Sequence, residues 1–103
     1  MSVALMRSPD SIRDVAGILR YFIDKNTPAT ALKFGKRVER TLELLALFPE
    51  MGSLWDSKKT GMQGMRFQSV QGFRKYLIFY RMTEPGLYVE RIVGGRRDLE
   101  QLL

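Results

Sequence analysis

The sequence predicts a single α+β domain over residues 1–103, in which an N-terminal αα-hairpin packs on a small antiparallel β-sheet. Apolar residues recur every three or four positions between residues 8 and 48, which indicates two amphipathic helices. From Met65 the apolar period changes to two, which indicates consecutive β-strands joined by short turns. At 103 residues the chain is long enough to form one hydrophobic core without disulfide or metal cross-links.

Two proline-containing sequences predict where the helices begin. Ser8 is suited to the N-cap of the first helix, and Pro9 to its first helical position. Asn26-Thr27-Pro28 ends that helix and begins the second, which should run from about Pro28 to Phe48 with Thr27 as its cap. The residues expected on the buried stripes are Ile12, Val15, Ala16, Leu19, Phe22 and Ile23 in the first helix, and Ala31, Phe34, Val38, Leu42, Leu45 and Phe48 in the second.

Three strands are expected in the second half of the chain. The first contains Met65 to Val70 and the second is a long strand from Phe73 to Met82, whose middle is apolar on both faces as in a central strand. After a turn at Glu84-Pro85-Gly86, the third strand should alternate from Leu87 onward. The residues expected on one of its faces are Leu87, Val89, Arg91 and Val93, and those on the other are Tyr88, Glu90 and Ile92.

Three further segments complete the predicted fold. Ser2 to Met6 is a candidate first strand, and Arg96 to Leu103 is expected to form a short C-terminal tail helix. Glu50 to Gly61 should be a loop whose one large apolar side chain, Trp55, covers the core.

Composition limits the classes of chemistry. The chain has neither cysteine nor histidine, which excludes disulfides, cysteine nucleophiles and the usual zinc sites, and removes the side chain best suited to proton transfer near neutral pH. Its net charge of +6 is uneven, with a balance of +1 over residues 1–57, +7 over residues 58–97 and −2 at the end. Such a basic sheet region indicates either a nucleic acid or an acidic protein as partner.

One set of residues could support catalysis. Arginines can stabilise a pentacovalent phosphate, and a lysine or tyrosine with a lowered pKa could act as a base in RNA cleavage. The strand period, however, places Tyr80 and Arg81 on opposite faces, so these groups cannot all converge. We therefore expect a binding protein rather than an enzyme. The set consists of Lys58, Lys59, Arg66, Arg74, Tyr80 and Arg81.

Nearly the whole chain resembles the ParE toxins of the ParE/RelE superfamily of type II toxin–antitoxin systems. The order and spacing of several segments carry the resemblance, although none of them is specific alone. These segments are Asp14, Ile18 and Tyr21 to Ile23; Asn26 to Pro28 with Ala31 and Phe34; Leu45 to Gly52; Gly64 to Arg66; Gly72 to Arg81; and Val89 to Asp98.

The resemblance implies a toxin with the RelE/ParE-like fold that inhibits DNA gyrase, restrains growth in plasmid or chromosome stabilisation, and is neutralised in a hetero-oligomer by a ParD-like antitoxin. The RelE-like branch, which cleaves mRNA on the ribosome, is the alternative, and an antitoxin-binding relative without toxicity is a third. RelE-like toxins usually carry a Tyr or His near the C-terminus. This chain has neither after Tyr88, and Gly94 replaces the common family His, which argues against the ribonuclease.

Contact residues are predicted on this basis. Those expected to contact the target are Arg66, Arg91, Arg96, Arg97, Leu102 and Leu103, and those expected to contact the antitoxin are Leu19, Phe22, Tyr80 and Tyr88. We expect neither a cofactor nor a metal, and no sequence-specific contact with nucleic acid. Because no targeting signal and no membrane-spanning run are evident, a cytoplasmic location is expected.

Overall fold

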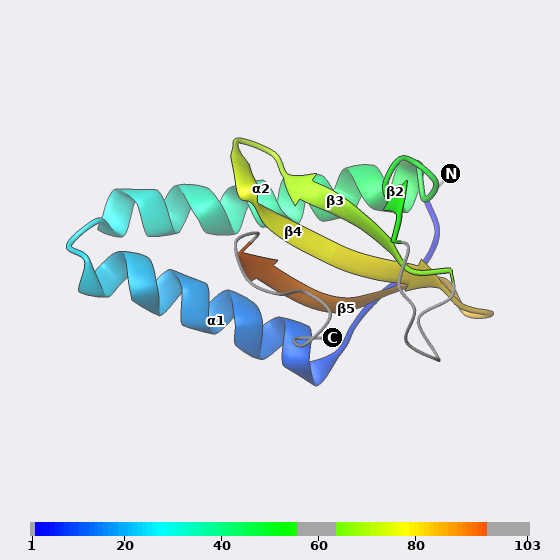
Figure 1. The fold of residues 1–103 in the computed structure, drawn as a ribbon, viewed down its shortest axis with the longest axis horizontal. Coiled ribbons are helices and arrows are strands. Elements are labelled where there is room, and N and C mark those ends of the chain that lie inside the picture. The colour runs from blue at the N-terminus through cyan, green and yellow to red at the C-terminus, as the bar shows by residue number, and fades with distance from the viewer. Residues whose placement is uncertain (1, 56–63, 95–103) are drawn as a thin grey trace.

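The computed structural model describes residues 2–55 and 64–94. The elements are β1 (Leu5–Arg7), α1 (Pro9–Asp24), α2 (Pro28–Leu47), β2 (Ser53–Leu54), β3 (Arg66–Val70), β4 (Phe73–Met82) and β5 (Leu87–Gly94). They form a two-layer arrangement, in which the antiparallel helices α1 and α2 lie on one side of a single sheet. Helix α1 lies alongside β5 (Figure 1). The predicted α+β class, with its helices segregated to one face, is confirmed.

The sheet contains five strands in the order β1-β5-β4-β3-β2. Strands β3, β4 and β5 pair antiparallel in chain order, as predicted, β2 pairs antiparallel with β3, and β4 lies at the centre. β1 pairs parallel with β5, with Leu5 opposite Leu87 and Arg7 opposite Val89, so the complete sheet is mixed. This pairing joins two segments about 80 residues apart along the chain, and a periodicity read from each segment alone cannot reveal it.

Ser8 connects the first helix to the sheet. Its hydroxyl accepts a hydrogen bond from the Ser11 N–H at 2.9 Å, which confirms the predicted N-cap, and donates one to the Glu90 carbonyl at 2.7 Å. Thr27 is the N-cap residue of α2, as predicted, but its side chain makes no capping hydrogen bond there. Its hydroxyl instead donates to the Phe22 carbonyl at 2.6 Å, so Thr27 closes the end of α1.

The buried face of α1 is rotated from the predicted stripe. Ile12 and Ile23 are 55 % and 58 % exposed, and Ala16 is exposed too, so their predicted burial is wrong. The positions that turn inward also include two polar ones, Ser11 and Asp14, because the Ser11 hydroxyl donates to the Ser8 carbonyl and the Asp14 carboxylate accepts from the Ile92 N–H. A search for apolar residues alone therefore misplaces the stripe.

The buried stripe of α2 agrees with the prediction at every position except its last. Phe48 is 60 % exposed because the helix ends at Leu47 and the chain leaves the core there. The stripe packs against the helix-facing side of β3, β4 and β5 and forms the main core. Its fully buried members are Phe34, Val38, Leu42, Leu45, Val70, Ile78, Tyr80, Leu87, Val89 and Ile92.

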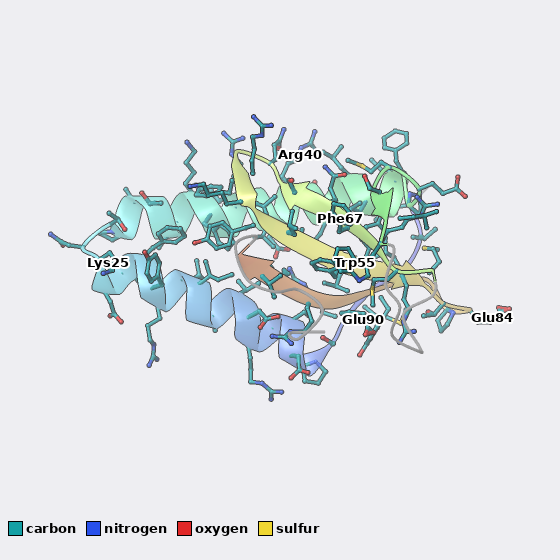
Figure 2. All side chains as sticks on the ribbon, viewed as in Figure 1. Lys25, Arg40, Trp55, Phe67, Glu84 and Glu90 are labelled. Carbon is teal, nitrogen blue, oxygen red and sulfur yellow. The ribbon has the colours of Figure 1, made fainter. Side chains whose placement is uncertain are left out.

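A second, smaller core covers the other face of the sheet, as the apolar middle of β4 predicts. Phe79 is fully buried there with Met65 and Val93. The ring of Trp55 packs edge-on against Phe79 and Phe67, at centroid distances of 5.4 and 6.0 Å. Figure 2 shows Trp55 over the face of β4 that is turned away from α2. The prediction that Trp55 covers a core is confirmed, and β2 is a short strand inside the predicted loop.

A β-bulge changes the faces of β5. Phe79 is opposite Arg91 but Tyr80 is opposite Val89, so Glu90 is the additional residue. Beyond the bulge the alternation reverses: Val89 and Ile92 both belong to the main core, and Val93 belongs to the second core. The predicted sharing of one face by Val89 and Val93 is therefore wrong.

Candidate interaction surfaces

Arg91 and Asp14 form an ion pair between β5 and α1. The carboxylate accepts hydrogen bonds from Arg91 Nε at 2.7 Å and Arg91 Nη2 at 3.0 Å, and a third from the Ile92 backbone N–H at 2.9 Å. The hydrogen bond to Asp14 raises the pKa of Arg91, partly opposed by desolvation. Both side chains are more than half buried. Beyond the end of β1, Asp14 thus supplies the outer edge of β5 with a hydrogen-bond acceptor that a neighbouring strand would otherwise provide.

Arg66 is held by the loop that follows α2. Its Nη1 donates to the Gly52 carbonyl at 2.7 Å and to the Glu50 carbonyl at 3.3 Å. The guanidinium group is thereby fixed between β3 and that loop. Arg81 also has a partner, the carboxylate of Glu90 at 3.3 Å.

Tyr80 has 0 % exposure and bonds to the same loop. Its hydroxyl donates to the Pro49 carbonyl at 2.8 Å and accepts from the Gly52 N–H at 3.0 Å. Burial raises the pKa of the Tyr80 phenol, while the Gly52 hydrogen bond and the charge of Arg66 lower it by less. In this conformation Tyr80 presents no surface to an antitoxin, so the residue is placed as an anchor for the loop.

The other predicted contact residues lie in different parts of the molecule. Leu19 and Phe22 are half-buried against the main core, where the Phe22 ring is 5.7 Å from that of Phe34. Tyr88 is half-buried in β5, between Met6 of β1 and Arg81 of β4. The predicted target contacts Arg96, Arg97, Leu102 and Leu103 lie outside the described residues.

The two described target candidates do not form one surface. Arg66 is paired across the ladder with Tyr80 of the main core, whereas Arg91 is paired with Phe79 of the second core. Residues directly opposite each other share a face, so the two arginines leave the sheet on opposite faces and are separated by β4. The structure brings together Arg66 and Tyr80, which share Gly52 as a partner.

The hydrogen bond from Ser8 to β5 and the roles of Asp14 and Gly52 were not predicted. For Asp14 the sequence did contain a signal. Position 14 is three residues after Ser11 and one before Val15, which places its carboxylate on the inward face of α1. No comparable signal existed for Gly52, because its role depends on a close approach to Tyr80 of β4.

The described part of the chain has neither a metal-binding cluster nor a membrane-spanning helix. Within residues 2–55 and 64–94, no cluster of acidic side chains is arranged to hold a metal ion. Neither helix in these ranges combines the length and the apolar character that crossing a bilayer requires.

An αα-hairpin on one face of a small mixed sheet defines a class of small α+β domains. This class includes a chain of a solved structure, the chromosomal ParDE toxin–antitoxin system from P. aeruginosa. That chain is similar in fold with a TM-score of 0.73 at 16 % sequence identity, and the match covers 90 % of this chain and 96 % of the other.

Residues 5–99 match the model of a protein family, the ParE toxin of the type II toxin–antitoxin system parDE. The chain belongs to the ParE toxin family, as the sequence resemblance indicated. No curated protein matches the chain.

Proposed function

We propose that this ParE-type toxin inhibits DNA gyrase by protein–protein contact, without catalysing a reaction itself, and that a ParD-like antitoxin neutralises it in a hetero-oligomer. Membership of the ParE family over residues 5–99 supports the gyrase target, because the resemblance to ParE implies it. An antitoxin partner follows from the toxin–antitoxin system to which the family belongs.

The burial of Tyr80 is the observation that carries the contact mechanism. A general base must come within hydrogen-bond reach of the proton it removes. The Tyr80 hydroxyl is enclosed between Pro49 and Gly52, and burial raises its pKa, which disfavours the phenolate that a base requires. Arg66 and Arg81 of the same candidate set are bonded to a backbone carbonyl and a carboxylate of this chain. Both placements favour a structural role over cleavage of RNA.

The decisive experiment measures gyrase and mRNA in parallel. Purified toxin should inhibit gyrase supercoiling in a concentration-dependent manner, and added antitoxin should restore it. Induced expression should cause a DNA damage response and filamentation while transcripts stay intact. Rapid translation arrest with cleaved transcripts would instead identify the RelE-like alternative. Neither effect, together with preserved antitoxin binding, would identify a relative that has lost toxicity.

The C-terminal segment contains four of the six predicted target contacts. Deletion of residues 96–103 should abolish gyrase inhibition and leave antitoxin binding measurable by calorimetry. The full-length double variant Arg96→Ala/Arg97→Ala is the matched control, since it removes the cations and retains the apolar end. Unchanged inhibition by the deletion variant would exclude a role of this segment in target contact.

A further inference from the structure

The outward face of α2 carries a row of cations. Lys36 and Arg37 are adjacent, and each lies three or four positions from both Lys33 and Arg40, so the four cations lie along one side of the helix. All are exposed except Arg37, which is half-buried. Figure 2 shows Arg40 on the side of α2 away from α1. This face is turned away from both the helix partner and the main core.

The β3–β4 hairpin extends this row. The turn at Gln71-Gly72 packs directly on α2: the Gln71 N–H donates to Thr41 Oγ1 at 2.9 Å, and a Cβ at Gly72 would lie 3.4 Å from Arg37 Nη1. Arg74 and Lys75 follow that turn and are both exposed. We define the basic cluster as Lys33, Lys36, Arg37, Arg74 and Lys75.

The basic cluster has no acidic counterpart in the described part of the chain. No ion pair within residues 2–55 and 64–94 includes any of its members. The two acidic residues of α2 are used elsewhere, Glu39 with Arg7 at 2.6 Å and Glu43 with Arg40 at 3.5 Å. Lys33, Lys36 and Arg37 are like charges on one side of α2 and repel each other, while Arg74 and Lys75 add positive charge at the neighbouring turn, and an anionic partner would relieve that repulsion. By contrast, Arg66, Arg81 and Arg91 of the sheet all have partners within the chain.

The same helix face becomes apolar toward its C-terminal end. Leu44 and Leu47 follow Arg40 at four and seven positions, and Leu47 is 47 % exposed. Beside them is a hollow of about 680 Å³, to which exposed apolar side chains contribute. It is lined by Leu47, Phe48, Pro49, Glu50, Met51 and Met82. Contiguous exposed apolar surface of this kind marks an interaction site on a small protein.

The combination of charge and apolar surface selects the kind of partner. A nucleic acid would match the cations. Proteins that bind single strands, however, also place aromatic rings among their cations, on which the bases stack. The exposed aromatic residue Phe48 instead follows the C-terminal end of α2, at the end of this face away from the basic cluster. A peptide with acidic residues along one part and apolar residues in the next matches both halves of the face.

We propose that the outward face of α2 binds an acidic, amphipathic segment of the antitoxin, with carboxylates on the basic cluster and apolar side chains in the hollow at Leu47 and Phe48. This inference rests on the proposed pairing with an antitoxin. The distance from Lys33 to Leu47 along α2 is about 21 Å, so a helical segment of about 14 residues covers it.

Two variants of the full-length toxin test the two halves separately. Lys36→Glu/Arg74→Glu/Lys75→Glu reverses the charge of the basic cluster, and Phe48→Ser removes the exposed ring without affecting the core. Arg20→Glu, an exposed charge reversal on α1, is the matched control. The probe is the purified ParD-like antitoxin of the proposed pairing, titrated by calorimetry at low and high salt. Each test variant should lose roughly tenfold affinity or more, and only the charge variant should lose the salt dependence. The control should stay within about twofold of the wild type.

Three outcomes would overturn the inference: unchanged antitoxin affinity in both test variants, equal losses in Arg20→Glu, or a 20-base-pair DNA duplex that binds the wild type and competes with the antitoxin. Gyrase supercoiling is measured on the same proteins. Variants that still inhibit gyrase but escape the antitoxin support both proposals. If the wild type leaves gyrase unaffected, the proposed function fails, and the calorimetric comparison still decides the docking site.

Discussion

The carboxylate of Asp14 receives three hydrogen bonds from β5, two from the Arg91 side chain and one from the Ile92 backbone. Loss of either side chain breaks the ion pair, but only loss of Asp14 also leaves a backbone donor unpaired. We therefore expect Asp14→Ala to lower the free energy of unfolding by roughly 2–4 kcal/mol, and Arg91→Ala by about 1 kcal/mol less. Urea denaturation of both variants at neutral pH checks this order, and a larger loss in Arg91→Ala would contradict it.

Tyr80 gives the protein a predictable response to alkali. Burial raises the pKa of Tyr80. It also raises the pKa of Tyr76, and the charge of Tyr21 raises the Tyr76 pKa further by a smaller amount. The unfolded state therefore loses these protons first, near pH 10, and stability falls as the pH rises above that value. The free energy of unfolding should decrease between pH 9 and pH 11.

Tyr80→Phe tests the source of this decrease. The variant should have a flatter pH profile above pH 10 and, at pH 7, a stability lower by roughly 1–3 kcal/mol, because the buried Gly52 N–H loses its acceptor. Tyr88→Phe, which removes a phenol from the half-buried part of β5, is the control. Equal profiles for the wild type and Tyr80→Phe would show that Tyr80 does not contribute.

At the scale of elements, the loop between α2 and β2 is fixed by contact with the sheet rather than by its own sequence. A Cβ at Gly52 would lie 2.5 Å from the Tyr80 hydroxyl and 2.8 Å from the Phe67 carbonyl. Gly52→Ala must therefore displace the loop that holds Arg66 as well as Tyr80. We expect a loss of roughly 2 kcal/mol or more, measured by thermal or urea unfolding.

Gly17→Ala is the matched control for that prediction. Gly17 lies inside α1, and a Cβ there would meet no atom within 4 Å. Because alanine favours the helix over glycine, the same substitution should here stabilise the protein by about 0.5–1 kcal/mol. Opposite signs at the two positions would show that close packing at Gly52, and not a general intolerance of alanine, causes the loss.

At the scale of the whole molecule, the periodicity of apolar residues was sufficient to predict the two helices and the three-stranded meander. It was insufficient to predict how these elements contact one another. The change of period at Met65 and the two proline-containing helix starts correctly indicated the αα-hairpin and the antiparallel meander. The parallel pairing of β1, the bulge at Glu90 and the inward carboxylate of Asp14 depend on segments distant in sequence. The sequence also shows the positive charge of the sheet region, but it cannot show which arginines have a partner within the chain, because that depends on three-dimensional contacts. In the part of the chain that the structure describes, the cations of the basic cluster, which take part in no ion pair, lie on α2 and at the start of β4.

Because Arg91 has an internal partner in Asp14, its predicted role as a target contact can be tested separately from its role in the fold. Asp14→Ala and Arg91→Ala break the same ion pair, but only the first variant keeps the guanidinium group. If Arg91 serves the fold, both variants should inhibit gyrase in proportion to their folded fraction, measured by circular dichroism under the conditions of the supercoiling assay. Inhibition lost in Arg91→Ala beyond its folded fraction, and retained in Asp14→Ala, would place Arg91 in contact with the target. Since the ion pair holds α1 against β5, we expect the proportional result.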